Sequence, residues 1–256
     1  MRIILSPAKK MKEEPESLPP SGLPEYIGQA EEILKWLKQQ SREELQKLWN
    51  CNDKITDQNV ERLKHMELRQ RLSPAILSYE GIAYQYMAPA VFETGQFAYV
   101  QKHLRILSAF YGVLKPMDGV APYRLEMQAK ASLAGKKDLY ELWGGRLYHA
   151  VKDDSGIIIN LASKEYAKCI EQHLSLEDMY ITIKFCEKSK GKLVTKGTYA
   201  KMARGEMVRW MAENQIEYPE EIRMFDRLGY VFRKDISSDQ EYVFERIINK
   251  QTEVSL

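Results

Sequence analysis

Three consecutive isoleucines at positions 157 to 159 restrict the fold of this chain more than any other feature of its sequence. They lie in residues 156–162, a short β-branched run that favours a strand, because a buried helix needs a longer apolar stretch. Residues 2–6 and 104–109 have the same character and predict two more inner strands. Stretches with helical spacing separate these runs, which is typical of an α/β fold. We therefore expect a mixed α/β (α+β) architecture: a central, mostly parallel sheet, flanking helices and a smaller antiparallel portion towards the carboxyl end.

Apolar spacing and turn signals predict the other elements. Ser41 and Glu44 form a capping box, which indicates that a helix begins there. Further helices are expected from Pro24 through Leu37 and over residues 57–68, 94–103 and 198–214. A hairpin around residues 190–191 is expected to join strands 180–185 and 192–196, and a last strand pair is expected over 229–233 and 241–245. Residues 75–79 fit either a strand or a helical turn. We expect a single domain over 1–248 and a flexible tail over 249–256.

The overall charge gives no strong field for attracting a polyanion. The chain has 38 Lys and Arg residues against 36 Asp and Glu residues, so a nucleic-acid partner would have to meet a local patch. No apolar stretch approaches the roughly 20 residues of a membrane span, and no signal-peptide core is found near the start. We therefore expect a cytoplasmic protein that does not bind membranes.

Cysteine and histidine spacing gives no sign of a metal or redox site. The three cysteines are widely spaced and the four histidines lack the spacing that puts two ligands on one helical face; they are Cys51, Cys169, Cys186, His65, His103, His149 and His173. We expect the cysteines to be small buried hydrophobic residues, and we predict no metal and no cofactor.

Four serines lie at or near the ends of expected strands, namely Ser6, Ser78, Ser108 and Ser163. The carboxyl ends of strands border the ligand crevice in open α/β sheets, and small hydroxyl residues there leave space and supply hydrogen bonds. Serine also suits strand exits and turns for purely structural reasons. Both interpretations stay open, and together the four positions indicate a candidate cleft.

Two segments concentrate basic residues. In residues 104–127, glycines and prolines stiffen a loop that would present Arg105, Lys115 and Arg124, an arrangement suited to anion capture. Arg124 and Glu126 would share a face of an extended segment, so their ion pair could orient the arginine or merely close the surface.

The second basic segment, residues 184–209, holds eight Lys or Arg against two Glu, a net charge of +6. Helical spacing puts Lys201, Arg204 and Arg209 on one side, with Gly205 between them. A solvated face would have the same pattern. Glycine costs a helix about 1 kcal/mol relative to alanine, so Gly205 indicates that something approaches the backbone closely.

No motif identifies a reaction. The chain has no G-x-S-x-G elbow, P-loop or G-x-G-x-x-G fingerprint. Candidate nucleophiles are Ser6, Lys9 and Ser163, each of which also has a structural or ligand-binding interpretation. Candidate acids or bases are Asp118, Glu126 and Glu165, which the sequence alone cannot pair.

Six strings in order along the chain resemble the YaaA family of bacterial peroxide-stress proteins: residues 5–9 (LSPAK), 104–118, 122–127 (PYRLEM), 139–144 (LYELWG), 159–166 (INLASKEY) and 200–205 (AKMARG). The resemblance implies a YaaA-type α/β fold, a cytosolic role in limiting free iron and oxidative damage during peroxide stress, and a basic cleft associated with DNA binding. It implies no settled enzymatic activity.

The positions inside these strings give a candidate ligand- or anion-binding cleft of ten residues: Ser6, Lys9, Arg105, Tyr111, Arg124, Glu126, Asn160, Ser163, Lys201 and Arg204. Two departures from the family pattern stand out. Ile82 and Ala83 replace an Asp-Val pair, so a carboxylate is missing. Asp57 stands where a helix-hairpin-helix DNA contact, expected over residues 54–66, would use glycine, and its negative charge would oppose a phosphate.

Two functions are therefore expected from the sequence. The first is a stress protein that binds double-stranded DNA through the two basic segments. The second is an enzyme or binder of a small phosphorylated or nucleotide-like ligand in the same cleft. A deep pocket joining Ser6, Arg124 and Ser163 would favour the small ligand, and a broad open groove would favour DNA. A third and less specific possibility is that the protein takes part in iron homeostasis through contacts with other proteins.

Overall fold

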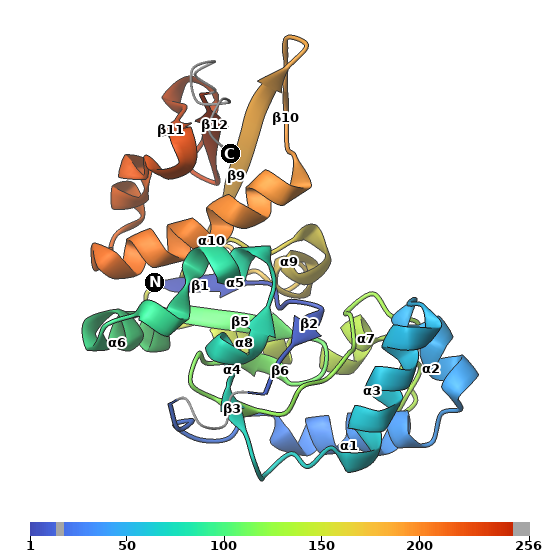
Figure 1. Ribbon diagram of the computed structural model, residues 1–256. Helices are drawn as coiled ribbons and strands as arrows, with labels where there is room; N and C mark the ends of the chain where they lie inside the picture. The colour runs from blue at the N-terminus through green and yellow to red at the C-terminus, as the bar shows by residue number, and fades with distance from the viewer. Residues whose placement is uncertain (14–17, 248–256) are drawn as a thin grey trace.

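The computed structural model describes residues 1–13 and 18–247 (Figure 1), so the tail expected over 249–256 lies outside the described residues. Within the described part, eight strands form a central sheet. In order across the sheet they are β11 (Tyr230–Phe232), β12 (Glu241–Arg246), β9 (Met179–Ser189), β8 (Ile157–Asn160), β1 (Arg2–Leu5), β5 (Leu104–Ser108) and β6 (Gly112–Leu114), with β10 (Lys192–Val194) paired to β9.

The inner strands run parallel. β1 pairs in parallel with both β5 and β8, with Ile3 opposite Leu104 on one side and Ile159 on the other. β8 with β9 and β9 with β12 are also parallel, whereas β6, β10 and β11 are attached antiparallel. Ile3, Leu104 and Ile159 are fully buried, as expected for strands with both faces covered. The predicted mixed α/β fold with a mostly parallel sheet is confirmed.

Helices and short paired segments surround this sheet. The α-helices are α1 (Ile27–Lys38), α2 (Arg42–Trp49), α3 (Asp53–His65), α4 (Ala75–Ser78), α5 (Ile82–Met87), α6 (Thr94–His103), α7 (Leu139–Trp143), α8 (Arg146–Val151), α9 (Lys164–Glu171) and α10 (Gly197–Glu213). The 3₁₀ turns are η1 (Pro89–Val91), η2 (Pro219–Met224), η3 (Arg227–Gly229) and η4 (Lys234–Ile236). Two small antiparallel pairs join β2 (Lys10–Met11) to β4 (Tyr79–Glu80) and β3 (Ser73–Pro74) to β7 (Gly119–Val120).

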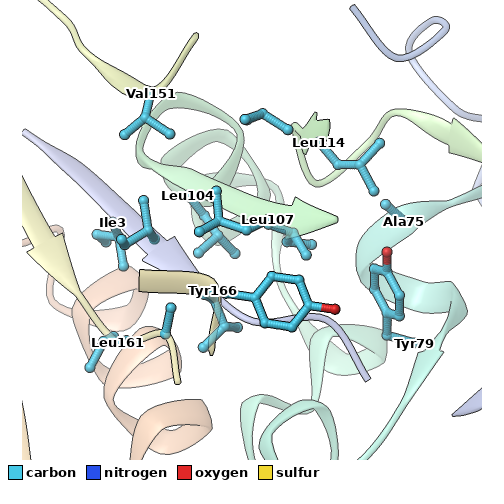
Figure 2. Packing of buried hydrophobic residues seen from close by; sticks show 14 of the residues in the cluster. Ile3, Ala75, Tyr79, Leu104, Leu107, Leu114, Val151, Leu161 and Tyr166 are labelled. Carbon is cyan, nitrogen blue, oxygen red and sulfur yellow. The ribbon is translucent and has the colours of Figure 1, made fainter. Parts of the chain in front are cut away.

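One continuous core fills the space between the layers. Figure 2 shows Ile3 of β1, Leu104 and Leu107 of β5, and Leu161 after β8 packed together. Tyr166 of α9 belongs to the same cluster, so α9 packs against a buried face of the sheet. In Figure 1, α10 runs across the molecule beside α5, with the β9–β10 hairpin on one side of it and α1 to α3 grouped at the far end.

The strongest local signals predicted their elements correctly. The capping box is formed in both directions: the Glu44 N–H donates to Ser41 Oγ (3.2 Å) and the Ser41 N–H donates to the Glu44 carboxylate (2.7 Å). The hairpin turns at Lys190 (φ 48°) and Gly191 (φ 78°), with Ser189 opposite Lys192. Two consecutive left-handed residues are what a tight two-residue hairpin needs.

Several predicted boundaries differ from the structure. Residues 75–79 form a helical turn, α4, followed by a short strand, so Ser78 does not end a strand of the central sheet. Gly112–Leu114, expected to be loop, pairs with β5 as an edge strand. Helices of five to eight residues, α5, α7, α8 and α9, were not predicted, because so few residues carry too little helical period.

The segment expected to hold a helix-hairpin-helix contact forms a single helix up to its last residue. Residues 54–66 fall almost entirely within α3, and Asp57 is not at a turn but pairs with Arg42 of α2 at 2.7 Å. The turn between α2 and α3 is instead at Asn50, which adopts a left-handed conformation (φ 43°). Asparagine tolerates that conformation better than most residues, so the turn forms without glycine.

Among the described residues, no helix is both long enough and apolar enough to span a membrane.

Candidate functional site

A cavity of about 470 Å³ opens at the carboxyl ends of β1 and β8. Ser6 and Lys9 reach it from the segment after β1, and Ser163 from the start of α9, just beyond β8. The loop after β7 contributes Arg124 and Glu126. Parallel strands leave an opening where their chains diverge to opposite faces, which explains why a cavity lies here.

Hydrogen bonds among two serines and a tyrosine join the segments that line the cavity. The Ser6 hydroxyl donates to Ser163 Oγ (3.1 Å) and accepts the Ser163 N–H (2.8 Å). The Tyr84 hydroxyl of α5 donates to the Ser6 carbonyl oxygen (3.0 Å). Because the Ser6 proton is engaged by another hydroxyl and no base within residues 1–13 and 18–247 contacts it, these bonds join β1 to α9 and α5 without activating a nucleophile.

Cations outnumber carboxylates around the cavity. Among the described residues, its lining includes five cations, Lys9, Lys10, Arg124, Lys201 and Arg204, and three carboxylates, Glu80, Glu126 and Glu165, a net charge of +2. The whole chain also has a formal net charge of only +2, so the excess at the cavity is a local feature. A concave site of this kind concentrates field lines and attracts anions.

Glu126 links two of these cations. Its carboxylate lies 2.7 Å from Lys9 Nζ and 3.6 Å from an Arg124 Nη. The Lys9 side chain is 65% exposed, whereas those of Arg124 and Glu126 are 12% and 17% exposed. The Lys9 pair therefore contributes little to stability, and Glu126 mainly holds Arg124 in place beside the cavity.

Two buried guanidinium nitrogens at this site lack hydrogen-bond partners. The Nε atoms of Arg124 and Arg204 are both buried, and neither has a partner among the described residues. Burial lowers the pKa of Arg204 below its usual value. Buried donors in folded proteins are nearly always hydrogen-bonded, so these two arginines, which line one cavity, have hydrogen-bonding capacity that no described residue uses.

Glu165 is the carboxylate with the most perturbed environment in the cavity. Its Oε1 accepts the Gln128 N–H (3.1 Å). Burial, followed by the nearby Glu126, raises the pKa of Glu165 above its usual value. A carboxyl group that takes up a proton more readily than usual reduces the repulsion of an incoming anion.

The innermost lining is apolar and aromatic. It includes Leu5, Leu125, Leu161, Tyr84, Tyr123 and Tyr166, each at most 6% exposed. Two of the tyrosine hydroxyls are already hydrogen-bonded: Tyr84 donates to the Ser6 carbonyl oxygen, and Tyr123 bonds Ser108 (2.7 Å) and Tyr79 (2.9 Å). The cavity therefore combines an apolar floor with a cationic rim.

Seven of the ten predicted site residues line this cavity: Ser6, Lys9, Arg124, Glu126, Ser163, Lys201 and Arg204. The other three do not. Arg105 is buried near the opposite end of β5 and donates to the carbonyl oxygens of Gln101 (3.2 Å) and Leu104 (2.7 Å). Burial lowers its pKa to about 10.

The remaining two predicted residues hold local backbone. The buried Tyr111 hydroxyl donates to the Ala121 carbonyl oxygen (3.2 Å) and accepts the Ala121 N–H (3.0 Å). Asn160 accepts the Ala162 N–H through Oδ1 (2.8 Å) and lies 3.4 Å from Thr182 Oγ1. Each side chain hydrogen-bonds backbone groups of a loop that would otherwise be buried without a partner.

The four strand-end serines divide in the same way. Ser6 and Ser163 line the cavity, but Ser78 and Ser108 are fully buried outside it. Ser108 accepts the N–H groups of Phe110 (3.2 Å) and Tyr111 (2.9 Å), so it shapes the turn after β5. For Ser108 the structural interpretation is the correct one.

Much of the second basic segment is neutralised by neighbouring carboxylates. Lys184 pairs with Glu241 (3.4 Å), Lys196 with Glu187 (2.5 Å) and Arg209 with Glu213 (2.8 Å). Lys188, Lys190 and Lys192 are exposed on the hairpin. Lys201 and Arg204 are therefore the cations of this segment that α10 brings to the cavity.

Sequence reasoning missed the contribution of α5 and β4. Glu80, Gly81 and Ile82 all line the cavity, and Gly81 lets Ala8 approach so closely that an added Cβ would lie 2.8 Å from the Ala8 Cβ. One sequence feature could have indicated this contribution. Ile82, which lines the cavity, is one of the positions where the chain departs from the family pattern.

Residues 1–236 match the model of the family described as "Peroxide stress protein YaaA". The chain belongs to the YaaA family. Proteins named UPF0246 protein resemble it over nearly their full length: one from Agathobacter rectalis is 66% identical over 97% of this chain and 100% of its own. Others from Lachnoclostridium phytofermentans and Pediococcus pentosaceus are 53% and 47% identical over 95% of this chain and 96% and 97% of theirs.

Membership of the YaaA family places the chain among peroxide-stress proteins, as the six sequence strings predicted. The family description names no reaction and no ligand for the cavity. Among the described residues, no group of three or more His, Cys, Asp or Glu side chains could hold a metal ion.

Proposed function

We propose that this protein acts in the cytosol during peroxide stress, where it limits iron-dependent damage, and that the basic surface around its cavity binds double-stranded DNA. The observation that carries the DNA-binding part is the pair of buried, unsatisfied Nε atoms on Arg124 and Arg204, inside a rim of exposed lysines. Phosphate oxygens are strong acceptors for guanidinium groups, and lysines on the rim add charge without requiring a fixed geometry.

The size of the cavity restricts how DNA would bind. A volume of about 470 Å³ is far too small for a duplex, so the duplex would lie across the rim. There it would meet Lys9, Lys10 and Lys201, and one phosphate could reach the arginines. Each neutralised phosphate releases counterions, so binding should weaken steeply with salt.

Fluorescence anisotropy of a labelled duplex at several salt concentrations tests this proposal. The Lys201→Ala/Arg204→Ala variant should bind at least about tenfold more weakly than wild type, because two charge-assisted contacts are lost. The matched control, Lys102→Ala/Arg209→Ala, removes two cations that pair with Glu217 and Glu213 and do not line the cavity. Its affinity should stay near that of wild type. Absent or salt-independent binding by wild type would refute DNA binding.

A small phosphorylated or nucleotide-like ligand is a second candidate function. The specific observation in its favour is that one pocket joins Ser6, Arg124 and Ser163 and has the volume of a small-molecule site, roughly 300–1,000 Å³. Such a ligand at a hundredfold excess over its Kd should raise the unfolding free energy by about 2.7 kcal/mol. Thermal unfolding with a panel of phosphorylated metabolites checks this, and a panel without any shift would argue against it.

A further inference from the structure

The cavity has two chemically distinct zones. Its floor contains buried aromatic and aliphatic side chains, among them Tyr84, Tyr166 and Leu161. Arg124 and Arg204 line the same cavity and are less exposed than the lysines of its rim. A ligand that satisfies both zones must have one flat or apolar part and one anionic part.

A nucleotide has this division. Every base has a π-face that packs on aromatic and aliphatic side chains, and its phosphate matches the fork of donors on an arginine. A cavity of about 470 Å³ is within the range of single-ligand sites. Inorganic phosphate alone would leave the apolar floor uncovered, and a duplex cannot enter.

Polar groups also line the cavity. Ser6 and Ser163 are partly exposed there and hydrogen-bonded to each other, and Gly81 allows the loop holding Ala8 to close against the start of α5. The lining thus supplies hydroxyl oxygens beside apolar walls. Sites that hold an extruded base combine apolar or aromatic walls with a few hydrogen-bonding groups in the same way.

We propose that the cavity holds one nucleotide, with its base against the apolar floor and its phosphate at Arg124 and Arg204. This inference rests on the proposed DNA-binding function: the nucleotide is one that has left the stack of a duplex lying across the lysine rim. Extruding a base costs less free energy where the base is mismatched or unpaired. The protein should therefore prefer a duplex that contains such a base.

The test uses two duplexes of the same length, one matched and one with an unpaired 2-aminopurine. Anisotropy measures the affinity for each, and acrylamide quenching of the 2-aminopurine emission measures whether the base is sheltered. Wild type should bind the duplex with the unpaired base about tenfold more tightly and protect that base from the quencher. A third arm titrates free 2-aminopurine nucleoside monophosphate.

The Ile82→Trp variant fills the cavity from the first turn of α5 and leaves all five cations in place. It should lose the tenfold preference and the protection of the base. The matched control, Val91→Trp, adds the same side chain at a position that is 65% exposed and outside the cavity. It should keep both. If Ile82→Trp fails to fold, the wild-type measurements alone still decide the question.

The outcomes separate the two proposals. Duplex binding with no preference, no protection and no binding of the free nucleotide would overturn the nucleotide site and leave DNA binding intact. Binding of the free nucleotide without duplex binding would support the site and refute the DNA-binding function. Preference and protection, both lost in Ile82→Trp, would support the two together.

Discussion

Gly205 lies where α10 crosses α5, and the crossing is so close that no other residue fits. A Cβ built at this position would lie 1.8 Å from the carbonyl oxygen of Ala83 and 2.6 Å from its carbonyl carbon. Both are backbone atoms, so neither can rotate away. The close approach that the sequence predicted at Gly205 is therefore that of α5, and it positions the helix that carries Ile82 and Tyr84 into the cavity.

Replacing Gly205 with alanine should destabilise the protein by about 3 kcal/mol, because the helices must separate to admit one methyl group. Urea unfolding measures this. Gly197→Ala is the matched control, since Gly197 begins the same helix and has no atom within 4 Å of an added Cβ. That variant should stay within about 1 kcal/mol of wild type. Equal effects of the two substitutions would contradict the crossing argument.

At the residue scale, the carboxyl ends of β1 and β8 led the sequence to two residues of the site. Ser6 follows directly on β1 and Ser163 comes three residues after β8, and both line the cavity, whereas Ser108, the last residue of β5, does not. Arg105 is the second residue of β5. At ~3.3 Å per residue it lies about 10 Å from the carboxyl end of that strand, so it is near the amino-terminal edge of the sheet and away from the cavity. The family resemblance over residues 104–118 could not reveal which edge of the sheet Arg105 lies at, because those residues cover β5 from end to end.

At the scale of elements, the β9–β10 hairpin is the part of the basic segment that extends from the body of the molecule (Figure 1). Its two-residue turn is fixed by the left-handed conformations of Lys190 and Gly191. Lys188, Lys190 and Lys192 are exposed around it, and the chain leads from β10 into α10, which brings Lys201 to the cavity. A duplex lying on the rim would have this hairpin within reach if it extended past the amino-terminal end of α10, where β10 leads into the helix.

Changing these three lysines to glutamine should reduce the salt dependence of duplex binding. The slope of log K against log salt should fall in magnitude by about 0.9 for each lysine that contacts a phosphate. Anisotropy titrations at several salt concentrations give the slope. The same three positions changed to arginine keep the charge and should keep the slope. An unchanged slope in the glutamine variant would exclude the hairpin from the DNA contact.

Elements were predictable in proportion to their length and to the strength of their end signals. α10 and the β9–β10 hairpin, with long periodicity and a Lys-Gly turn, were placed within a few residues. α5 has six residues, fewer than two turns, and its helical period cannot be distinguished from chance. This limit affected the site directly, because α5 supplies one wall of the cavity.

For the whole molecule, ionic contacts fasten the amino-terminal edge of the parallel sheet, opposite the cavity. Asp153, before β8, lies 3.4 Å from the terminal ammonium group and 3.2 Å from Arg2 Nε on β1. Asp178, before β9, has a side chain with 0% exposure and lies 2.9 Å from Lys152 Nζ. Strand order in a parallel sheet cannot be obtained from local signals, and neither can these contacts between segments that the sheet brings together.

Asp178 should make the stability of the whole fold sensitive to acid. Burial acts to raise its pKa, but hydrogen bonds from Tyr148 (2.6 Å), Lys152 and Ser175 outweigh burial and lower the pKa well below its usual value. A carboxylate with a lowered pKa stabilises the fold above its unfolded-state pKa of about 3.9, and this contribution disappears as the pH falls through the folded-state pKa. Asp178→Asn should therefore reduce the unfolding free energy at neutral pH, by about 2 kcal/mol for the lost charged hydrogen bonds.

The difference in unfolding free energy between wild type and Asp178→Asn should be constant from neutral pH down to about 5 and should narrow below about 3.9. Urea unfolding across this range measures it, with Asp239→Asn as the control because the Asp239 side chain is exposed. A difference that does not change with pH would mean that Asp178 acts through packing rather than charge. A narrowing difference would establish that ionised Asp178 holds the start of β9 against α8, at the edge of the sheet opposite the cavity.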